Sequence, residues 1–271
     1  MIDLGPLPRA LADAVESARP RFGAHVGRIV YTASLPSTMD AAATLADGGD
    51  GHGLVVVAGQ QTAGRGRRGH TWASPEGAGL YLSWVVSPPV EPHLDGAPNV
   101  LGLLTLAAGL AVAEGISHAT GLEASLKWPN DLFYGYKLAG VLAEGHRIAT
   151  AGQFVVIGVG INIRDVAYVS ERERATSLER ELRAVPDAGS VLAEVLAAWA
   201  ARYQDLLDGQ FARVVDRWRV RAAGLVGRPV AWADARGDYE GTTSGVDAAG
   251  ALLVDTGVEV VRITSGSVQW Q

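Results

Sequence analysis

Runs of apolar residues divide the chain into strand-like and helix-like segments. Short, nearly continuous apolar runs at 54–58, 80–86 and 154–163 predict buried strands. The stretch 100–119 predicts a buried helix. Its uncharged part, 100–113, is shorter than the roughly 18 residues that a membrane-spanning helix needs. Further along, periodic apolar positions predict helices at 190–207, with Ser190 as N-cap, and at 211–221.

The sequence patterns near the two ends of the chain predict how it divides into domains. Residues 8–18 predict one short helix within an N-terminal extension, 1–25, ahead of a main domain at 26–222. After Gly224 the sequence pattern changes and predicts short strands, separated by turn residues, at 229–232, 239–246, 251–254 and 258–263. A series of short strands of this kind predicts a small β-barrel domain at 223–271. The fold class is therefore α+β.

Local signals place several turns. A helix is predicted to begin near Ser37, which can cap it, with Asp40 three residues later. Residues 132–144 predict a hairpin that turns at Gly135, and Lys137 opens its second arm. The proline-containing stretch 88–99 predicts a loop, and the charged stretch 171–183 predicts a solvated loop and helix.

Composition narrows the class of protein. Hydrophobic residues make up 48% of the 271 residues, which predicts an ordered globular chain. Cysteine is absent, so disulfides, thiolate metal sites and cysteine nucleophiles are excluded. The first 22 residues lack the apolar core of a signal peptide, and we expect a soluble, cytoplasmic protein that binds no membrane.

The most concentrated chemical signal is a basic, glycine-rich loop at 64–70, in a chain whose formal net charge is −6. Its residues are Gly64, Arg65, Gly66, Arg67, Arg68, Gly69 and His70. Glycine permits close backbone approach, and arginine binds carboxylates and phosphates, so the loop predicts a local anionic ligand. The spacing matches G-x-G-x-x-G, but Pro75 and Gly77 stand where a dinucleotide-binding fold requires a growing helix. The residues that follow the loop therefore exclude a Rossmann dinucleotide-binding site.

A second polar cluster, 127–131, contains Lys127, a Trp-Pro step, Asn130 and Asp131. One carboxylate beside an amide suits Mg²⁺, which proteins hold with few side chains plus phosphate and water. A structural Asn-Asp turn after proline is the alternative. Asn162 lies within an apolar strand, so its side chain is either hydrogen-bonded structurally or faces a ligand.

Taken together, these stretches resemble the biotin–protein ligase family. The matching segments are 37–38, 59–69 with Trp72, 80–83, 127–131, 137–142 and 158–162, in the family's order. The resemblance runs from about residue 26 to the end. It implies a mixed sheet with helices, like that of class II aminoacyl-tRNA synthetases, and an SH3-like C-terminal barrel. The implied activity uses ATP and Mg²⁺ to form biotinyl-5′-AMP. It then transfers biotin to a lysine of the carrier domain of a biotin-dependent carboxylase.

The resemblance also assigns residues. Arg67, Lys127 and Lys137 would serve the chemical step. Biotin would be held by Ser37, Thr38, Gln61, Gly64, Arg65, Arg67, Lys137 and Gly140. ATP would be held by Arg67, Arg68, His70, Trp72, Lys127, Asn130, Asp131 and Asn162, with Asp131 on the metal. We expect the loop 65–69 to be disordered without ligand and to close over the adenylate.

Two departures and two alternatives accompany this interpretation. Met39 and His70 stand where the family commonly has asparagine and arginine. Residues 1–25 are too short for a DNA-binding domain of the kind found in family members that act as repressors, so we expect no DNA binding. The alternatives are a lipoate–protein ligase, which shares acyl-adenylate chemistry, and a nucleic-acid-binding module. The acidic net charge opposes the second alternative.

Overall fold

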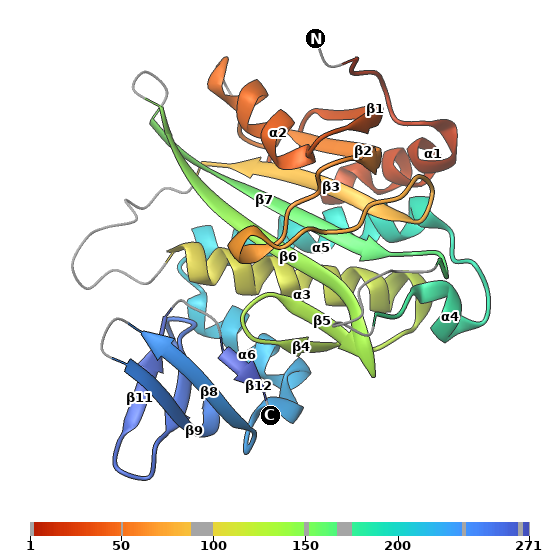
Figure 1. Ribbon diagram of the computed structural model, residues 1–271. Helices are drawn as coiled ribbons and strands as arrows, with labels where there is room; N and C mark the ends of the chain where they lie inside the picture. Colours follow the sequence, from red (N-terminus) through yellow and green to blue (C-terminus); the bar gives the residue numbers. More distant parts are fainter. Residues whose placement is uncertain are drawn as a thin grey trace.

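The computed structural model describes residues 3–49, 51–87, 100–148, 152–166, 175–234, 237–264 and 268–270. The predicted loop 88–99 and part of the charged stretch 171–183 lie outside these residues. The chain is built on a seven-stranded sheet whose order is β1-β2-β3-β7-β6-β5-β4 (Figure 1). Its strands are β1 (Ile29–Leu35), β2 (Val55–Gln61), β3 (Gly79–Val86), β4 (Ser125–Lys127), β5 (Asp131–Tyr134), β6 (Tyr136–Ile148) and β7 (Gly152–Asn162). Strands β1 and β2 are parallel and every other pair is antiparallel, so the predicted mixed sheet is confirmed.

Helices cover both faces of this sheet (Figure 1). They are α1 (Arg9–Ala18), α2 (Thr38–Asp47), α3 (Val100–Thr120), α4 (Leu178–Leu182), α5 (Ala188–Leu207) and α6 (Phe211–Arg221), with short 3₁₀ turns at η1 (Arg19–Arg21), η2 (Arg67–Gly69) and η3 (Ala223–Leu225). In β2, Val55 and Val57 join the large core beneath α3 and α5, whereas Val56 and Ala58 join a smaller core beneath α2. Because successive side chains point to opposite faces, a strand buried on both sides is apolar throughout.

Helix α3 confirms the prediction of a buried helix. By length and composition it could cross a membrane, but 72% of that window is buried inside the protein. Leu104, Leu110 and Ile116 are at most 1% exposed. Nearby, Trp84 of β3 stacks on Trp199 of α5 with ring centroids 4.8 Å apart, a geometry that adds about 1 kcal/mol to the burial of the two rings. The helix is therefore the centre of the core.

Two helix caps differ from the sequence prediction, although α2 begins where it was predicted. Ser37 stands at the N-cap of α2 in extended conformation, but its side chain makes no capping hydrogen bond. Helix α5 begins at Ala188, and its cap is Asp187, whose carboxylate accepts from the backbone N–H groups of Gly189 and Ser190. Ser190 instead donates its hydroxyl to Asp187 at 2.6 Å. The prediction of Ser190 as the cap was wrong because Asp187 reaches two free N–H groups.

The C-terminal part forms a second sheet, ordered β11-β10-β9-β8-β12 and antiparallel throughout (Figure 1). Its strands are β8 (Pro229–Asp234), β9 (Gly237–Val246), β10 (Leu252–Asp255), β11 (Val260–Ile263) and β12 (Val268–Trp270). The predicted α+β class with a small all-β unit is confirmed. The three-residue strands β4 and β12 were not predicted, since so short a run carries no periodic signal.

Both ends of the chain pack against the main body. Val15 and Phe22 are fully buried in the large core, where α1 lies against α5. At the other end, the indole Nε1 of Trp128 donates to the carbonyl of Gly250 at 3.0 Å, and Leu252 joins the same core. These contacts hold the small sheet beside the turn that carries the second polar cluster.

Candidate active site

A cavity of about 610 Å³ lies where α2, β6, β7, β12 and the loops 62–74 and 128–130 meet. The predicted residues that line it are Ser37, Thr38, Gln61, Arg65, Arg67, Arg68, His70, Trp72, Lys127, Asn130, Asp131, Lys137, Gly140 and Asn162. The fold thus brings together residues from five separated stretches of sequence. Their individual ligand assignments stay predictions.

Gly64 is the predicted residue that does not line this cavity. It is buried at the base of the loop, where its carbonyl accepts from the backbone N–H of Trp72 at 2.9 Å. A Cβ at this position would lie 2.5 Å from the Trp72 carbonyl oxygen and 2.8 Å from Ser74 Oγ. Packing therefore requires glycine here whether or not biotin is bound.

The buried end of the cavity comprises Ser37, Thr38 and Gln61. The backbone N–H and the hydroxyl of Thr38 both donate to Gln61 Oε1, at 2.9 and 3.1 Å. Ser37 is 2% exposed, and its hydroxyl has no hydrogen-bond partner among the described residues. Because a buried, unpaired hydroxyl is costly, this end is built to meet a polar group on a ligand.

The floor of the cavity is the indole of Trp72 lying on two glycines of neighbouring strands. A Cβ at Gly160 of β7 would lie 2.3 Å from the indole Nε1, and a Cβ at Gly140 of β6 would lie 3.0 Å from Cζ3. The Lys137 ammonium sits 5.5 Å from the ring centroid, within cation–π range. The glycines therefore let a flat aromatic surface lie close to the sheet backbone.

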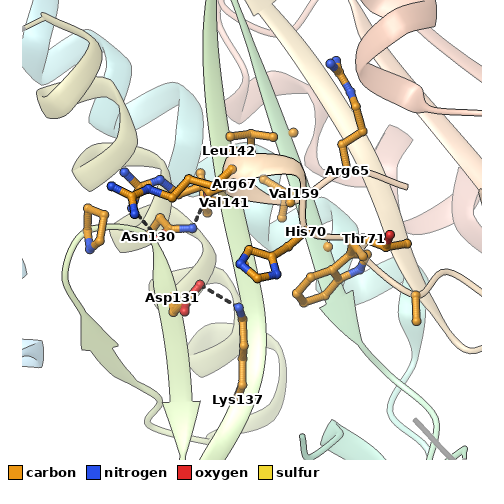
Figure 2. A pocket seen from close by; sticks show the side chains of 18 of the residues that line it. Arg65, Arg67, His70, Thr71, Asn130, Asp131, Lys137, Val141, Leu142 and Val159 are labelled. Atoms are coloured by element: carbon orange, nitrogen blue, oxygen red, sulfur yellow. Dashed lines mark hydrogen bonds and ion pairs between the residues drawn. The ribbon is translucent and has the colours of Figure 1, made fainter. Parts of the chain in front are cut away.

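The charged end of the cavity begins where the loop docks on the 128–130 turn. Arg67 Nη1 donates to Asn130 Oδ1 at 3.4 Å, and Asn130 Nδ2 donates to the Val141 carbonyl at 2.9 Å (Figure 2). Burial lowers the pKa of Arg67; Arg68 lowers it further and Asp131 opposes the shift. The guanidinium remains charged at neutral pH, so this end holds a partly desolvated cation.

Asp131 and Lys137 face each other across β5 and β6, with Oδ1 3.1 Å from Nζ (Figure 2). Their side chains are 23% and 17% exposed. The described residues contain no group of three or more histidine or acidic side chains that could hold a metal by themselves. A single carboxylate fits Mg²⁺ only where a nucleotide's phosphates supply most of the ligands, as the chemistry of Mg²⁺ allows.

Arg65 behaves differently from Arg67. Its guanidinium points away from Arg67 and Asn130 (Figure 2) and pairs with Asp40 Oδ1 at 2.9 Å and Glu144 Oε2 at 3.0 Å. These pairs tie the loop to α2 and β6. The Arg65 side chain is 38% exposed, so the pairs contribute modestly, and a ligand could exchange with them.

The second sheet also reaches the cavity. Val268 and Trp270 of β12 line it, and Lys127 Nζ lies between two rings, 4.9 Å from the Phe133 centroid and 5.2 Å from the Trp270 centroid. Sequence reasoning missed Val268 and Trp270 because no local motif surrounds them. An aromatic residue close to the end of a β-rich segment was the one available signal.

Asn162 is hydrogen-bonded structurally and also lines the cavity. Its Nδ2 donates to the carbonyls of Thr176, at 2.9 Å, and Lys137, at 3.4 Å.

Met39, Gly158 and Gly160 also line the cavity, although they were not among the predicted site residues. Met39 packs on Gly158, where a Cβ would lie 2.7 Å from its sulfur. Met39 therefore gives the cavity an apolar wall at a position where asparagine would offer a polar contact.

Comparison with known proteins places this site in a family. Residues 31–162 match the model of the biotin/lipoate A/B protein ligase family, and residues 225–270 match that of the biotin protein ligase C-terminal domain. The biotin–[acetyl-CoA-carboxylase] ligase of Mycobacterium tuberculosis is 35% identical over 84% of this chain and 83% of that protein. The bifunctional ligase/repressor BirA of Bacillus subtilis is 33% identical over 89% of this chain and 73% of that protein.

A solved structure is similar throughout. The biotin protein ligase from Aquifex aeolicus, in complex with biotin and ATP, has a TM-score of 0.74 and 28% identity, covering 90% of this chain and 98% of that one. With its mixed sheet, its small C-terminal sheet and its relatives in agreement, this chain belongs to the biotin/lipoate A/B protein ligase family, within the biotin protein ligases.

Proposed function

We propose that this chain is an ATP-dependent biotin–protein ligase. A biotin carboxylate oxygen attacks the α-phosphorus of ATP, the bond to the β-phosphate oxygen breaks, and biotinyl-5′-AMP and pyrophosphate form. The ε-amine of an acceptor lysine then attacks the acyl carbon, the bond to AMP breaks, and the amine loses a proton. The supporting observation is that the three arginines of the basic loop line one cavity with Lys127, Asp131, Lys137 and the buried polar end.

The geometry supports a division of roles along this cavity. The buried end, which comprises Ser37, Thr38 and Gln61, would hold the uncharged head of biotin, because its groups are neutral and desolvated. The carboxylate would then lie toward Arg67 and Lys137, where two cations offset the repulsion between two anions. Trp72, Lys127 and Trp270 offer the flat and cationic surfaces that suit an adenine and its phosphates.

Mg²⁺ fits this scheme as part of the nucleotide complex. Held there with the nucleotide, it would supply positive charge that offsets the charge of the phosphates. Asp131 would contact it, and Lys137, now paired with Asp131, would be freed toward the carboxylate. Arg65, Arg67 and Arg68 lie on a loop that can keep water from the adenylate once ligand is bound.

Further parts of the proposal concern the surroundings. The acceptor is the carrier domain of a biotin-dependent carboxylase, and the protein acts in the cytoplasm. Residues 26–222 form the catalytic domain and 223–271 the second domain. We retain the prediction that residues 1–25 bind no DNA, because α1 is one ten-residue helix packed on α5. A mobility shift of a biotin-operon operator duplex by this chain would contradict that part.

The decisive experiment incubates the purified chain with ATP, Mg²⁺, biotin and a purified biotin carboxyl carrier domain, and reads the mass of the acceptor. We expect one biotinyl group on one lysine. Matched arms omit ATP, or replace biotin by lipoate, or replace the acceptor lysine by arginine, and all three should leave the acceptor mass unchanged. Lipoylation with no biotinylation would transfer the proposal to the lipoate alternative.

A further inference from the structure

The chain carries its positive charge almost entirely as arginine. Arginine supplies 21 of the 23 basic residues, and lysine supplies the other two, Lys127 and Lys137. Lysine is ordinarily one of the commonest residues of globular proteins. Both lysines line the cavity, so the sequence places no lysine amine outside it.

The arginines and lysines of the cavity also divide by the element that carries them. Arg65, Arg67 and Arg68 lie on the basic loop. Lys127 ends β4, and Lys137 lies near the start of β6. The guanidinium groups are therefore on the segment that would close over an adenylate, and the amines are on strands of the sheet.

Both amines are held by neighbouring groups. Lys137 Nζ lies 3.1 Å from Asp131 Oδ1 and 5.5 Å from the ring centroid of Trp72. Lys127 Nζ lies 4.9 and 5.2 Å from the centroids of two aromatic rings. These contacts engage the ammonium form, which has no lone pair to attack a carbonyl carbon. An amine held on a strand also lacks the freedom to reach an attacking geometry that the fold does not already provide.

Arg68 is placed differently. It is exposed and lines the cavity from the tip of the basic loop. Its backbone is left-handed, with φ 55°, and Gly69 follows with φ 76°. Among the described residues Arg68 has no hydrogen bond or ion pair that would fix its side chain. A long side chain at this turn can therefore sweep across the space above the cavity.

A lysine at such a position would be an acyl acceptor. Its ε-amine would attack the acyl carbon of the adenylate, the bond to AMP would break, and an amide would form with loss of a proton. Only about one lysine amine in 2,500 is unprotonated at pH 7, but an effective molarity of about 10⁵ M for a well-placed group more than offsets that fraction. A guanidinium stays protonated and offers no such lone pair.

We propose that arginine at the mouth of the cavity, above all Arg68, determines where the biotinyl group goes. It supplies positive charge beside the adenylate without offering an amine of the enzyme's own. Arg68 is thus a specificity-determining residue of the transfer step, and the chain does not biotinylate itself. This inference rests on the proposed function, because it requires a bound acyl-adenylate.

The test supplies preformed biotinyl-5′-AMP, without acceptor, to the unaltered protein and to Arg68→Lys and Arg9→Lys. Preformed adenylate bypasses the step that uses ATP. The Arg9 side chain is 94% exposed on α1 and does not line the cavity, so Arg9→Lys reports acylation by adenylate free in solution. We expect Arg68→Lys to gain a biotinyl group on residue 68 at least about tenfold faster than Arg9→Lys gains one on residue 9. Intact mass and peptide mapping measure both rates.

Three outcomes would overturn the inference. They are equal rates at residues 68 and 9, label on Lys127 or Lys137 of the unaltered protein, and no label on the loop of either Arg68→Lys or a second variant, His70→Lys. The second variant places an amine two residues away, at another exposed position that lines the cavity. It carries the test if Arg68→Lys does not bind the adenylate.

A competition experiment separates this inference from the proposed function. With ATP, Mg²⁺, biotin and the carrier domain present, Arg68→Lys should divert to itself a share of biotinyl groups that rises as the carrier domain is diluted. The unaltered protein should label the carrier domain alone at every dilution, and self-labelling there would count against the inference. Failure of the unaltered protein to biotinylate the carrier domain would instead refute the proposed function.

Discussion

The two ends of the cavity are built on different physical principles. At the buried end, the neutral side chains of Ser37 and Thr38 are at most 3% exposed, and Thr38 donates to Gln61 Oε1 from its backbone N–H and its hydroxyl. At the charged end, Arg67, Asp131 and Lys137 are only partly buried. Arg67 contacts Asn130, and Asp131 pairs with Lys137, through contacts that a charged ligand can replace. The first end is set before a ligand arrives, and the second is free to rearrange around one.

This difference separates recognition from chemistry. Neutral, buried polar groups discriminate by the penalty that they impose on a mismatched ligand group, and they contribute equally to the ground and transition states. Partly desolvated cations stabilise charge that grows as the reaction proceeds. Substitutions at the charged end should therefore lower kcat. Substitutions at the buried end should mainly raise the KM for biotin, and substitutions at the floor should mainly raise the KM for ATP.

The largest effect is expected at Arg67. Arg67→Ala removes the cation docked on Asn130 and should lower the rate of adenylate formation about 10²–10³-fold, as loss of one transition-state donor does elsewhere. Single-turnover pyrophosphate release measures this step directly. Arg65→Ala is the matched control: its guanidinium pairs with Asp40 and Glu144, so its effect should be much smaller. Equal losses in both variants would contradict the division between the two arginines.

The next effect concerns the Asp131–Lys137 pair. Lys137→Met keeps the chain length but removes the ammonium 3.1 Å from Asp131, and kcat should fall about 10²-fold. It also leaves a half-buried carboxylate without that cation, which should lower the melting temperature. In Lys137→Met/Asp131→Asn the stability should recover while activity does not. Recovery of activity in the double variant would show that Lys137 serves only to balance Asp131.

A smaller effect is expected on the floor. In Gly160→Ala the new Cβ would lie 2.3 Å from the rigid Trp72 indole, so the ring must shift; we expect the KM for ATP to rise about tenfold with kcat little changed. In Gly158→Ala the new Cβ meets the flexible Met39 side chain at 2.7 Å, which can move more cheaply. Steady-state kinetics of both variants tests the order, and a larger effect at Gly158 would reverse it.

The smallest effect lies away from both ends and concerns stability alone. Asp187→Ala removes the N-cap of α5 and should cost about 1 kcal/mol in the free energy of unfolding at pH 7. Asp208→Ala, at the other end of the same helix, should cost close to nothing, because a carboxylate there opposes the helix dipole. Urea titrations of both variants at pH 7, with unchanged kcat, check this.

The pH dependence of that prediction has a definite sign. The Ser190 hydroxyl, aided by the N–H groups of Gly189 and Ser190, lowers the pKa of Asp187 against the opposing effect of burial. The carboxylate therefore adds stability above its ordinary value of 3.8, and this contribution is lost as pH falls through the lower folded pKa. The difference between Asp187→Ala and the unaltered protein should shrink as pH is lowered below that value. A constant difference down to pH 2 would contradict this cause.

Secondary structure was predictable wherever periodicity was long. The helices at 100–119 and 211–221 and the strands at 80–86 and 154–163 agree closely with α3, α6, β3 and β7. Errors arose where one contact decided the outcome. Asp187 displaced Ser190 as a cap, and Ser37 keeps its hydroxyl free although its sequence context is that of a capping residue. Propensity describes an average over contexts, and it cannot choose between neighbouring hydroxyl and carboxylate groups.

The sequence by itself determined the parts of this protein that depend on local residue type: apolar runs long enough to be strands buried on both faces, a glycine- and arginine-rich loop, and motifs in family order. Only the tertiary structure decided which of these parts meet. In the folded protein Gly64 does not line the cavity, and Trp270 lies beside Lys127. The Trp72 indole packs on Gly140 and Gly160. The fold also placed the backbone N–H and the hydroxyl of Thr38 against Gln61 Oε1. The physical reason is that packing and hydrogen-bond direction depend on distances between groups far apart in the chain, and local patterns do not contain those distances.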